Sequence, residues 1–370
     1  MTADQAKRSR LRDLGVTIGV MLAGAHNAVT DVPGVRVGHS TIIEGDNVRT
    51  GVTAVHPLEG SAFSEMPPAA IQILNGAGEI TGRSQVDEYG LLESPIMITN
   101  TLSVGTAHRG CIEWMRQQEP TLGPLHFSIP VVAETYDSFL NDIGGQHVTI
   151  EHVFDSLDSA TGGPVAEGNV GGGTGMMLFG FKGGIGTSSR LVTVEDREYT
   201  VGVLVQGNFG IREHLLVDGV PVGREITDLR LFRAPQQEMP ARDGSIIVVI
   251  ATDAPLSDRQ LARLCRRGML GLGQVGSTAT HGSGDLLVAF SNAPECRVNR
   301  FDTTAVLVTP RLDDRRLDPF FQATVEATAE SVLNALVAAE DMTGRDGNRA
   351  HALPHDRLME VMRKYGRLAV

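Results

Sequence analysis

The residue whose position most suggests chemistry is a serine that follows a turn and begins a strongly apolar run. Ser245 stands directly after Asp243 and Gly244, a pair typical of tight turns because glycine tolerates backbone angles that other residues avoid. The aliphatic, β-branched run Ile246–Ile250 predicts a buried strand. We therefore expect Ser245 at the first position of a rigid strand, where its hydroxyl could attack the carbonyl group of Gly244.

Such an attack would turn the Gly244–Ser245 peptide bond into an ester, and hydrolysis of that ester would leave Ser245 at the start of a new chain. A free α-amine has a reference pKa of about 7.7–8.0, which suits a base at neutral pH. The alternative is an ordinary turn that leads into a core strand, since Asp-Gly-Ser is a common tripeptide. Taken alone, the tripeptide favours the ordinary turn, so the other motifs must decide.

Two further stretches place polar side chains at the expected ends of strands. Glu134 follows the apolar residues 129–133 and could either pair with a substrate ammonium group or remain a solvated carboxylate. Asn208 lies between glycines at the end of the expected strand Tyr199–Gln206, where its amide could donate to an oxyanion or simply form a turn. Neither residue is decisive by itself.

The most glycine-rich stretch does not fit a nucleotide site. Gly168–Gly175 lacks the Gly-Lys-Ser/Thr ending of a phosphate-binding loop, and no strand precedes it. We expect instead a glycine-lined wall, where the backbone comes close to substrate or to another backbone segment.

The histidines do not form a recognisable catalytic or metal-binding pattern. His351 and His355 are four residues apart, but the proline between them breaks the helix that would align them. His281 lies so close in sequence to Ser283 and Asp285 that the three are not expected to form a relay, because neighbouring side chains diverge. We therefore expect no metal and no organic cofactor.

Composition excludes several classes of protein. Of 370 residues, 41% are apolar and 21% are charged, which is typical of a soluble globular protein. A net charge of −12 argues against binding to nucleic acid or to an anionic membrane surface. Three cysteines are too few for a disulfide framework or a zinc site and fit a reducing compartment. No apolar run reaches the roughly 20 residues of a membrane helix.

The stretch Lys7–Ala25 has the outline of a signal peptide, with basic residues before an apolar segment. Asp13 abuts that segment, and Gly15 and Gly19 dilute it. We therefore interpret Leu14–Ala25 as the first strand of the fold and expect a cytoplasmic protein.

Short apolar strands alternate with helices along the chain, and many strands look buried on both faces. The expected strands are Val35–Gly38, Gly51–Val55, Ala69–Leu74, Ile96–Thr99, Leu191–Val194, Tyr199–Gln206, Ser245–Thr252, Asp285–Phe290 and Thr304–Val308. The expected helices are Val104–Gln118, His147–Leu157, Ser257–Leu270, Pro319–Ala339 and Asp356–Tyr365. This pattern predicts a layered α/β sandwich that forms a single domain over residues 1–370.

Several long motifs occur in a fixed order and together carry a family resemblance. They are Glu134–Asp142, Gly168–Gly175 with Lys182–Arg190, Arg242–Ser245 and His281–Asp285. In these motifs the chain resembles the DmpA and β-peptidyl aminopeptidase family of self-processing N-terminal-nucleophile aminopeptidases (peptidase family S58). The similarity extends from Asn27 to Asp356. It implies a four-layer αββα sandwich, layered as in Ntn hydrolases but connected differently.

The resemblance also implies that the chain cleaves itself between Gly244 and Ser245. The products would be a large chain, 1–244, and a small chain, 245–370, which stay associated. Ser245 matches the nucleophile of the family, and Ser283 and Asp285 match the pair that orients this nucleophile and its amine.

The remaining matched positions imply how a substrate is held. Asn208 matches the amide on the oxyanion side, where a backbone N–H near Gly284 could assist. Tyr136 matches a phenol that faces the nucleophile, and Glu134 matches the carboxylate that holds the substrate's free amine. The expected partners are therefore small peptides or aminoacyl amides and esters, without nucleic acid, membrane or cofactor, and the family suggests a homotetramer of cleaved pairs.

Two alternatives remain open. The chain could be an acyltransferase related to the ornithine acetyltransferases, although an N-terminal threonine is typical there and Ser245 favours hydrolysis. It could also be an uncleaved protein that binds a small metabolite and has kept the fold without the chemistry.

Overall fold

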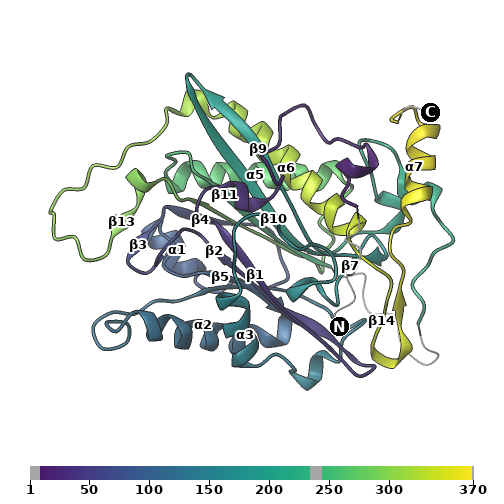
Figure 1. The fold of residues 1–370 in the computed structure, drawn as a ribbon, viewed down its shortest axis with the longest axis horizontal. Helices are drawn as coiled ribbons and strands as arrows, with labels where there is room; N and C mark the ends of the chain where they lie inside the picture. The colour runs from purple at the N-terminus through teal and green to yellow at the C-terminus, as the bar shows by residue number, and fades with distance from the viewer. Residues whose placement is uncertain (1–8, 234–243, 369–370) are drawn as a thin grey trace.

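Two β-sheets lie face to face between two pairs of helices in the computed structural model, which describes residues 9–233 and 244–368 (Figure 1). The first sheet has the order β1 (Arg36–Glu44), β2 (Val48–His56), β5 (Ile96–Asn100) and β6 (Val131–Thr135). The second has the order β4 (Ala69–Gly76), β12 (Gly284–Ser291), β11 (Ser245–Thr252), β10 (Arg197–Asn208) and β9 (Gly184–Val194).

Helices cover the outer face of each sheet and complete four layers. The first sheet packs against α2 (Val104–Gln118) and α3 (Ile150–Asp158), and the second against α5 (Asp258–Gln274) and α6 (Asp318–Val337). The other helices are α1 (Arg83–Tyr89), α4 (Val222–Glu225) and α7 (His355–Lys364). Two-residue strands complete the list: β3 (Glu65–Met66), β7 (Met177–Leu178), β8 (Phe181–Lys182), β13 (Val298–Asn299), β14 (Met342–Thr343) and β15 (Arg349–Ala350). The predicted αββα sandwich is confirmed.

Strand β11 shows why both faces of the second sheet are apolar. Ile247 and Val249 face the first sheet, whereas Ile246, Val248 and Ile250 belong to the apolar layer shared with α5 and α6. All five side chains are fully buried, so this strand reads in the sequence as a continuous aliphatic run rather than an alternating one.

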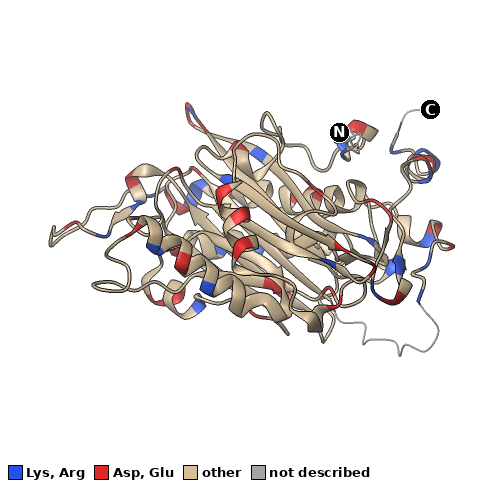
Figure 2. Ribbon diagram, turned by 60° about the horizontal axis from the view of Figure 1, so that its bottom comes forward, with Lys and Arg blue, Asp and Glu red and all other residues tan. Residues whose placement is uncertain are grey.

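Charged residues lie mostly on helices and loops, and the strands are largely free of them (Figure 2). Helix α5 begins as its sequence predicts, with Ser257 and Gln260 forming a capping box. Within the part of the chain that the structure describes, no helix is long and apolar enough to cross a membrane.

The expected strand Thr304–Val308 is wrong. These residues lie in an irregular loop that extends beyond β13 at the left of Figure 1. Val306 and Val308 are 75% and 90% exposed. The β-branched composition suggested a strand, but the loop pairs with no strand among the described residues, and propensity alone does not form a ladder.

The expected first strand Leu14–Ala25 is also wrong. A short 3₁₀ turn, Arg12–Leu14, leads into irregular chain that crosses β9 and α6. Its apolar residues Val16 and Ile18 are buried in the core beside α6, so the apolar pattern reflects packing rather than strand pairing. The start of the signal-peptide outline, at residues 7 and 8, lies outside the described residues.

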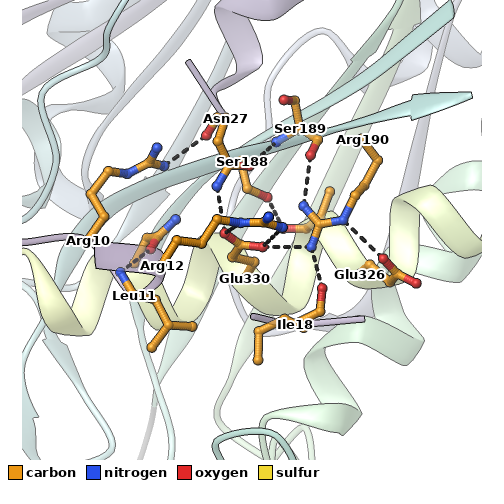
Figure 3. Close-up of polar contacts among 12 residues, drawn as sticks. Arg10, Leu11, Arg12, Ile18, Asn27, Ser188, Ser189, Arg190, Glu326 and Glu330 are labelled. Atoms are coloured by element: carbon orange, nitrogen blue, oxygen red, sulfur yellow. Dashed lines mark hydrogen bonds and ion pairs between the residues drawn. The ribbon is translucent and has the colours of Figure 1, made fainter. Parts of the chain in front are cut away.

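A buried ionic cluster ties this N-terminal segment to β9 and α6 (Figure 3). Arg190 is fully buried, and its guanidinium lies 2.6 Å from Glu330 and 3.0 Å from Glu326. Arg12 adds a second bond to Glu330 at 2.7 Å. Burial raises the pKa of Glu330, but the hydrogen bond from Arg12 and the charge of Arg190 outweigh it and leave the pKa below its usual value.

Candidate active site

Ser245 is the first residue of β11, the central strand of the second sheet. It therefore lies in the middle of the row of strand ends on one side of that sheet. Its backbone pairs with Gly284 of the parallel strand β12 on one side and with Asn208 of the antiparallel strand β10 on the other. The alternation of side chains along β11 places its hydroxyl on the same face as Ile247, toward the first sheet. Ser245 is buried, and the turn predicted before it involves Asp243, which lies outside the described residues.

Two backbone N–H groups hold the reacting atoms of the Gly244–Ser245 peptide. The N–H of Tyr136, just past the end of β6, donates to Ser245 Oγ at 3.3 Å. The N–H of Gly284 donates to the carbonyl oxygen of Gly244 at 3.0 Å. The second contact polarises the carbonyl group that the serine hydroxyl would attack.

The amide of Asn208 has a fixed orientation. Its Oδ1 accepts a hydrogen bond from the N–H of Met177 at 2.9 Å, and its Nδ2 donates to the carbonyl of Tyr136 at 2.7 Å. An amide nitrogen carries two hydrogens, so one remains for a further acceptor beside Ser245.

Glu134 lies at the end of β6 and is 3% exposed. It accepts hydrogen bonds from the N–H of Glu79, at 3.0 Å, and from the hydroxyl of Thr101. Burial raises the pKa of this carboxyl group, whereas these two hydrogen bonds lower it. A methyl group built at Gly78 would lie 3.0 Å from Glu134 Oε1 and 3.2 Å from Gly284 Cα, so the carboxylate stands beside the neighbour of Ser245.

Ser283 and Asp285 form a buried pair on β12 and its lead-in. The Ser283 hydroxyl donates to Asp285 Oδ1 at 2.6 Å, and burial raises the pKa of Asp285. Strand alternation puts Asp285 on the face of Leu287, toward α5, whereas the Ser245 hydroxyl points the other way. Within the described chain neither member of the pair hydrogen-bonds to Ser245 Oγ.

The structure brings most of the predicted residues together at this edge, with one difference. Tyr136 contacts the nucleophile through its backbone N–H, while its side chain is 48% exposed and its phenol has no hydrogen-bond partner among the described residues. A phenol that faces Ser245 therefore remains a prediction.

The residues set aside in the sequence lie elsewhere or act structurally. His281 is exposed, His351 pairs with Asp341 at 3.1 Å, and His355 bonds the carbonyl of Val337 at 2.8 Å. Across residues 9–233 and 244–368, no three His, Cys, Asp or Glu side chains gather in a way that could hold a metal ion.

The glycine-rich stretch is a close-packing element, as expected. A methyl group built at Gly172 would lie 2.8 Å from the carbonyl oxygen of Ile98 in the first sheet. One built at Gly173 would lie 2.5 Å from the nitrogen of Ile185 in the second. The loop therefore passes between the two sheets where no side chain fits.

Sequence reasoning missed three residues that support the site. Thr101 bonds Glu134 because β5 and β6 are parallel and end at the same edge. The N–H of Met177 orients Asn208, and the fully buried Lys182 holds the preceding loop through the carbonyl oxygens of Gly173 and Met176, at 3.2 and 2.9 Å. The shared edge of β5 and β6 could have pointed to Thr101, whereas no sequence signal indicated Met177 or Lys182.

A serine at the start of a central strand, in an αββα sandwich, defines the N-terminal-nucleophile class of hydrolase fold. The model of peptidase family S58 matches residues 27–350, and the chain belongs to this family.

Similar proteins align with this chain over nearly its full length and nearly their own. The β-peptidyl aminopeptidase BapA of Sphingosinicella microcystinivorans is 44% identical and aligns with 99% of this chain and 95% of its own. A Burkholderia sp. β-aminopeptidase structure is 41% identical, with a TM-score of 0.90 over 98% of this chain and 100% of that one. The L-aminopeptidase D-Ala-esterase/amidase of Ochrobactrum anthropi, described as a prototype of the serine aminopeptidases and a variant of the Ntn hydrolase fold, is 42% identical, with a TM-score of 0.90 over 97% and 99%. These matches confirm the predicted family and the assignment as a serine aminopeptidase or amidase.

Proposed function

We propose that the protein cleaves itself between Gly244 and Ser245 and then releases N-terminal residues from small peptides, amides or esters. The observation that carries this proposal is the geometry at the start of β11. The hydroxyl of Ser245 is held by the N–H of Tyr136, and the carbonyl of Gly244 is held by the N–H of Gly284. Nucleophile and electrophile of the first step are thus adjacent and separately anchored.

In self-cleavage, Ser245 Oγ bonds to the carbonyl carbon of Gly244, and the carbonyl oxygen takes up negative charge against the N–H of Gly284. The C–N bond then breaks, and the nitrogen takes up the proton that the serine hydroxyl has lost and becomes the α-amine of Ser245. Water hydrolyses the ester, which releases Gly244 as a carboxylate and restores the hydroxyl.

In turnover, the α-amine of Ser245 acts as the base for its own hydroxyl, and Ser283 with Asp285 holds that amine. Asn208 supplies the remaining amide hydrogen to the oxyanion. The buried carboxylate of Glu134 pairs with the substrate's free ammonium group, which selects an N-terminal residue. None of these steps requires a metal or an organic cofactor.

The names of the relatives suggest β-amino acids, L-amino acids or D-alanine derivatives as substrates. We propose a cytoplasmic enzyme that acts as a homotetramer of cleaved pairs, binds neither nucleic acid nor membrane, and forms one domain over 1–370. Acyl transfer, as in the ornithine acetyltransferases, and uncleaved metabolite binding are the alternatives; the separate N–H contacts to the Ser245 hydroxyl and to the Gly244 carbonyl support cleavage.

A denaturing gel with N-terminal sequencing tests the proposal. Purified protein should give two bands of about two thirds and one third of the mass, with the smaller starting at Ser245. The cleaved protein should hydrolyse aminoacyl p-nitroanilides with a free amine and spare their N-acetylated forms. A single band with full activity would contradict self-processing, and transfer of the acyl group to added amine in preference to water would favour the acyltransferase.

A further inference from the structure

A cavity of about 260 Å³ borders Asn208, the residue of β10 that pairs with Ser245. Its wall extends from Asn208, at the end of β10, to Thr280, in the segment that leads into β12, whereas Glu134 is not part of the wall and stands beside Gly284. Arg212, Glu213 and Arg230 contribute charged side chains to its wall. A substrate whose amine lies at Glu134 and whose carbonyl lies at Ser245 would extend its leaving group past Asn208 into this cavity.

One of the two arginines, Arg212, is held in place by contacts within the protein. Arg212 bonds the carbonyl oxygens of Phe179, Ile226 and Leu229 at 2.8, 3.1 and 2.8 Å, and its guanidinium lies 3.2 Å from the centre of the Phe181 ring. Burial, followed by the positive charge of Arg230, lowers its pKa to about 10. Arg212 is therefore a cation without a carboxylate partner among the described residues, and it makes this wall electropositive.

Arg230 is the arginine that remains available. It is exposed, and within the described chain its guanidinium makes no hydrogen bond and no ion pair, not even with Glu213 in the same wall. A guanidinium presents paired N–H groups that match the two oxygens of a carboxylate. Glu213 is the one acidic side chain in this wall, so it opposes binding of an anion there.

We infer that this cavity is the leaving-group subsite and that Arg230 binds the free α-carboxylate of a short peptide in it. This inference rests on the proposed aminopeptidase function. The volume lies below the roughly 300–1,000 Å³ of pockets that hold drug-sized ligands, which suits one or two residues. Dipeptides and tripeptides with a free C-terminus are then the preferred substrate class, ahead of C-terminal amides of the same sequence.

The test compares pairs of substrates that differ only in the terminal charge. For the native protein, kcat/KM is measured on L-alanyl-glycine and β-alanyl-glycine, on their C-terminal amides, and on the matching p-nitroanilides. The free acids should be preferred over the amides, and 0.5 M KCl should weaken that preference because salt screens an exposed charge pair.

Arg230→Gln should reduce kcat/KM for the free acids by about three- to thirtyfold, the range between an exposed ion pair and a charge-assisted hydrogen bond. It should leave the amides and p-nitroanilides unchanged, and Arg230→Lys should restore part of the loss. Glu213→Gln should raise the preference for the free acids. Arg197→Gln is the matched control, because Arg197 is an exposed arginine at the start of β10, outside the cavity wall, and makes no ion pair with any described residue.

The outcomes separate the two proposals. No hydrolysis of any substrate by the native protein would overturn the proposed function itself. Hydrolysis of p-nitroanilides without a preference for the free acid would overturn only the carboxylate subsite. An equal loss on acids and amides in Arg230→Gln would do the same, since it would show that Arg230 acts on the fold rather than on substrate charge.

Discussion

Replacing Glu134 by glutamine tests the amine anchor most directly. The side chain is buried and accepts two hydrogen bonds, from the N–H of Glu79 and the hydroxyl of Thr101. Glutamine keeps the size and one carbonyl oxygen, and a hydroxyl can accept as well as donate, so the fold should survive. What disappears is the negative charge opposite the substrate's ammonium group.

A hydrogen bond to a charged group contributes about 1.5–3 kcal/mol. Glu134→Gln should therefore lower kcat/KM for free-amine substrates by about ten- to a hundredfold, at about 1.4 kcal/mol per tenfold. N-acetylated substrates, which carry no ammonium group, provide the control. Equal kcat/KM values of the variant and the native protein on free-amine p-nitroanilides would refute the role of Glu134.

The pH profile gives a second, independent readout. Burial is the largest influence on the pKa of Glu134 and raises it, so the ionised form that binds an ammonium group is lost earlier as the pH falls. The acid limb of kcat/KM should lie above the usual glutamate value and vanish in Glu134→Gln. Because the exposed Glu79 raises the same pKa by its charge, Glu79→Gln should move the limb to lower pH. An unchanged acid limb in Glu134→Gln would assign it to another group.

Four other expectations concern cleavage, turnover and stability. Ser245→Ala should remain one intact, folded and inactive chain on a denaturing gel, and any cleaved product would exclude the serine as nucleophile. Asp285→Asn should lower kcat by about 10²–10⁴ with cleaved protein still present, a loss typical of misplaced acid–base groups, and a native kcat would remove the residue from the mechanism. Gly244→Ala puts a methyl group 2.7 Å from Phe209 Cα, so cleavage should slow in a time course, and full activity of the uncleaved form would show that the α-amine is dispensable. Arg190→Met removes the buried cation shared by Glu326 and Glu330 and should cost about 3–5 kcal/mol in urea unfolding, whereas an unchanged midpoint would mean that the remaining partners of the two carboxylates suffice.

The strands of the sandwich could be predicted from the sequence where both faces of a strand are buried. Ile246–Ile250 is apolar at every position because both faces of β11 are covered, and no partner outside the run is needed to recognise it. The errors lie where apolar residues serve another purpose. Val16 and Ile18 fill a core edge without pairing, and Val306 lies exposed in a loop, and neither circumstance can be read from local composition.

The sequence could indicate candidate residues of the site, but not the contacts between them. The family resemblance supplied Ser245, Asn208 and Glu134, and the structure places all three along one edge. The N–H of Tyr136 on the serine hydroxyl depends on how the first sheet lies over the second, which no local pattern encodes. The opposite faces of Ser245 and Asp285 follow from the register of β11 and β12, and that register becomes visible only once the strands are paired.

That register also suggests how the same strand ends could serve both proposed reactions, first self-cleavage and then substrate hydrolysis. In the intact chain the N–H of Gly284 donates to the carbonyl of Gly244, whose peptide bond to Ser245 is the one that the proposed self-cleavage would break. On the proposed mechanism, hydrolysis of the ester frees Gly244 to leave, and the same N–H then faces the position of a substrate carbonyl beside Ser245. The Asn208 amide, still held by Met177 and Tyr136, needs no rearrangement to donate its second hydrogen there. On this mechanism the chain's own peptide occupies the place of the later substrate, and cleavage frees the N–H of Gly284, whereas the second hydrogen of Asn208 is available before and after cleavage.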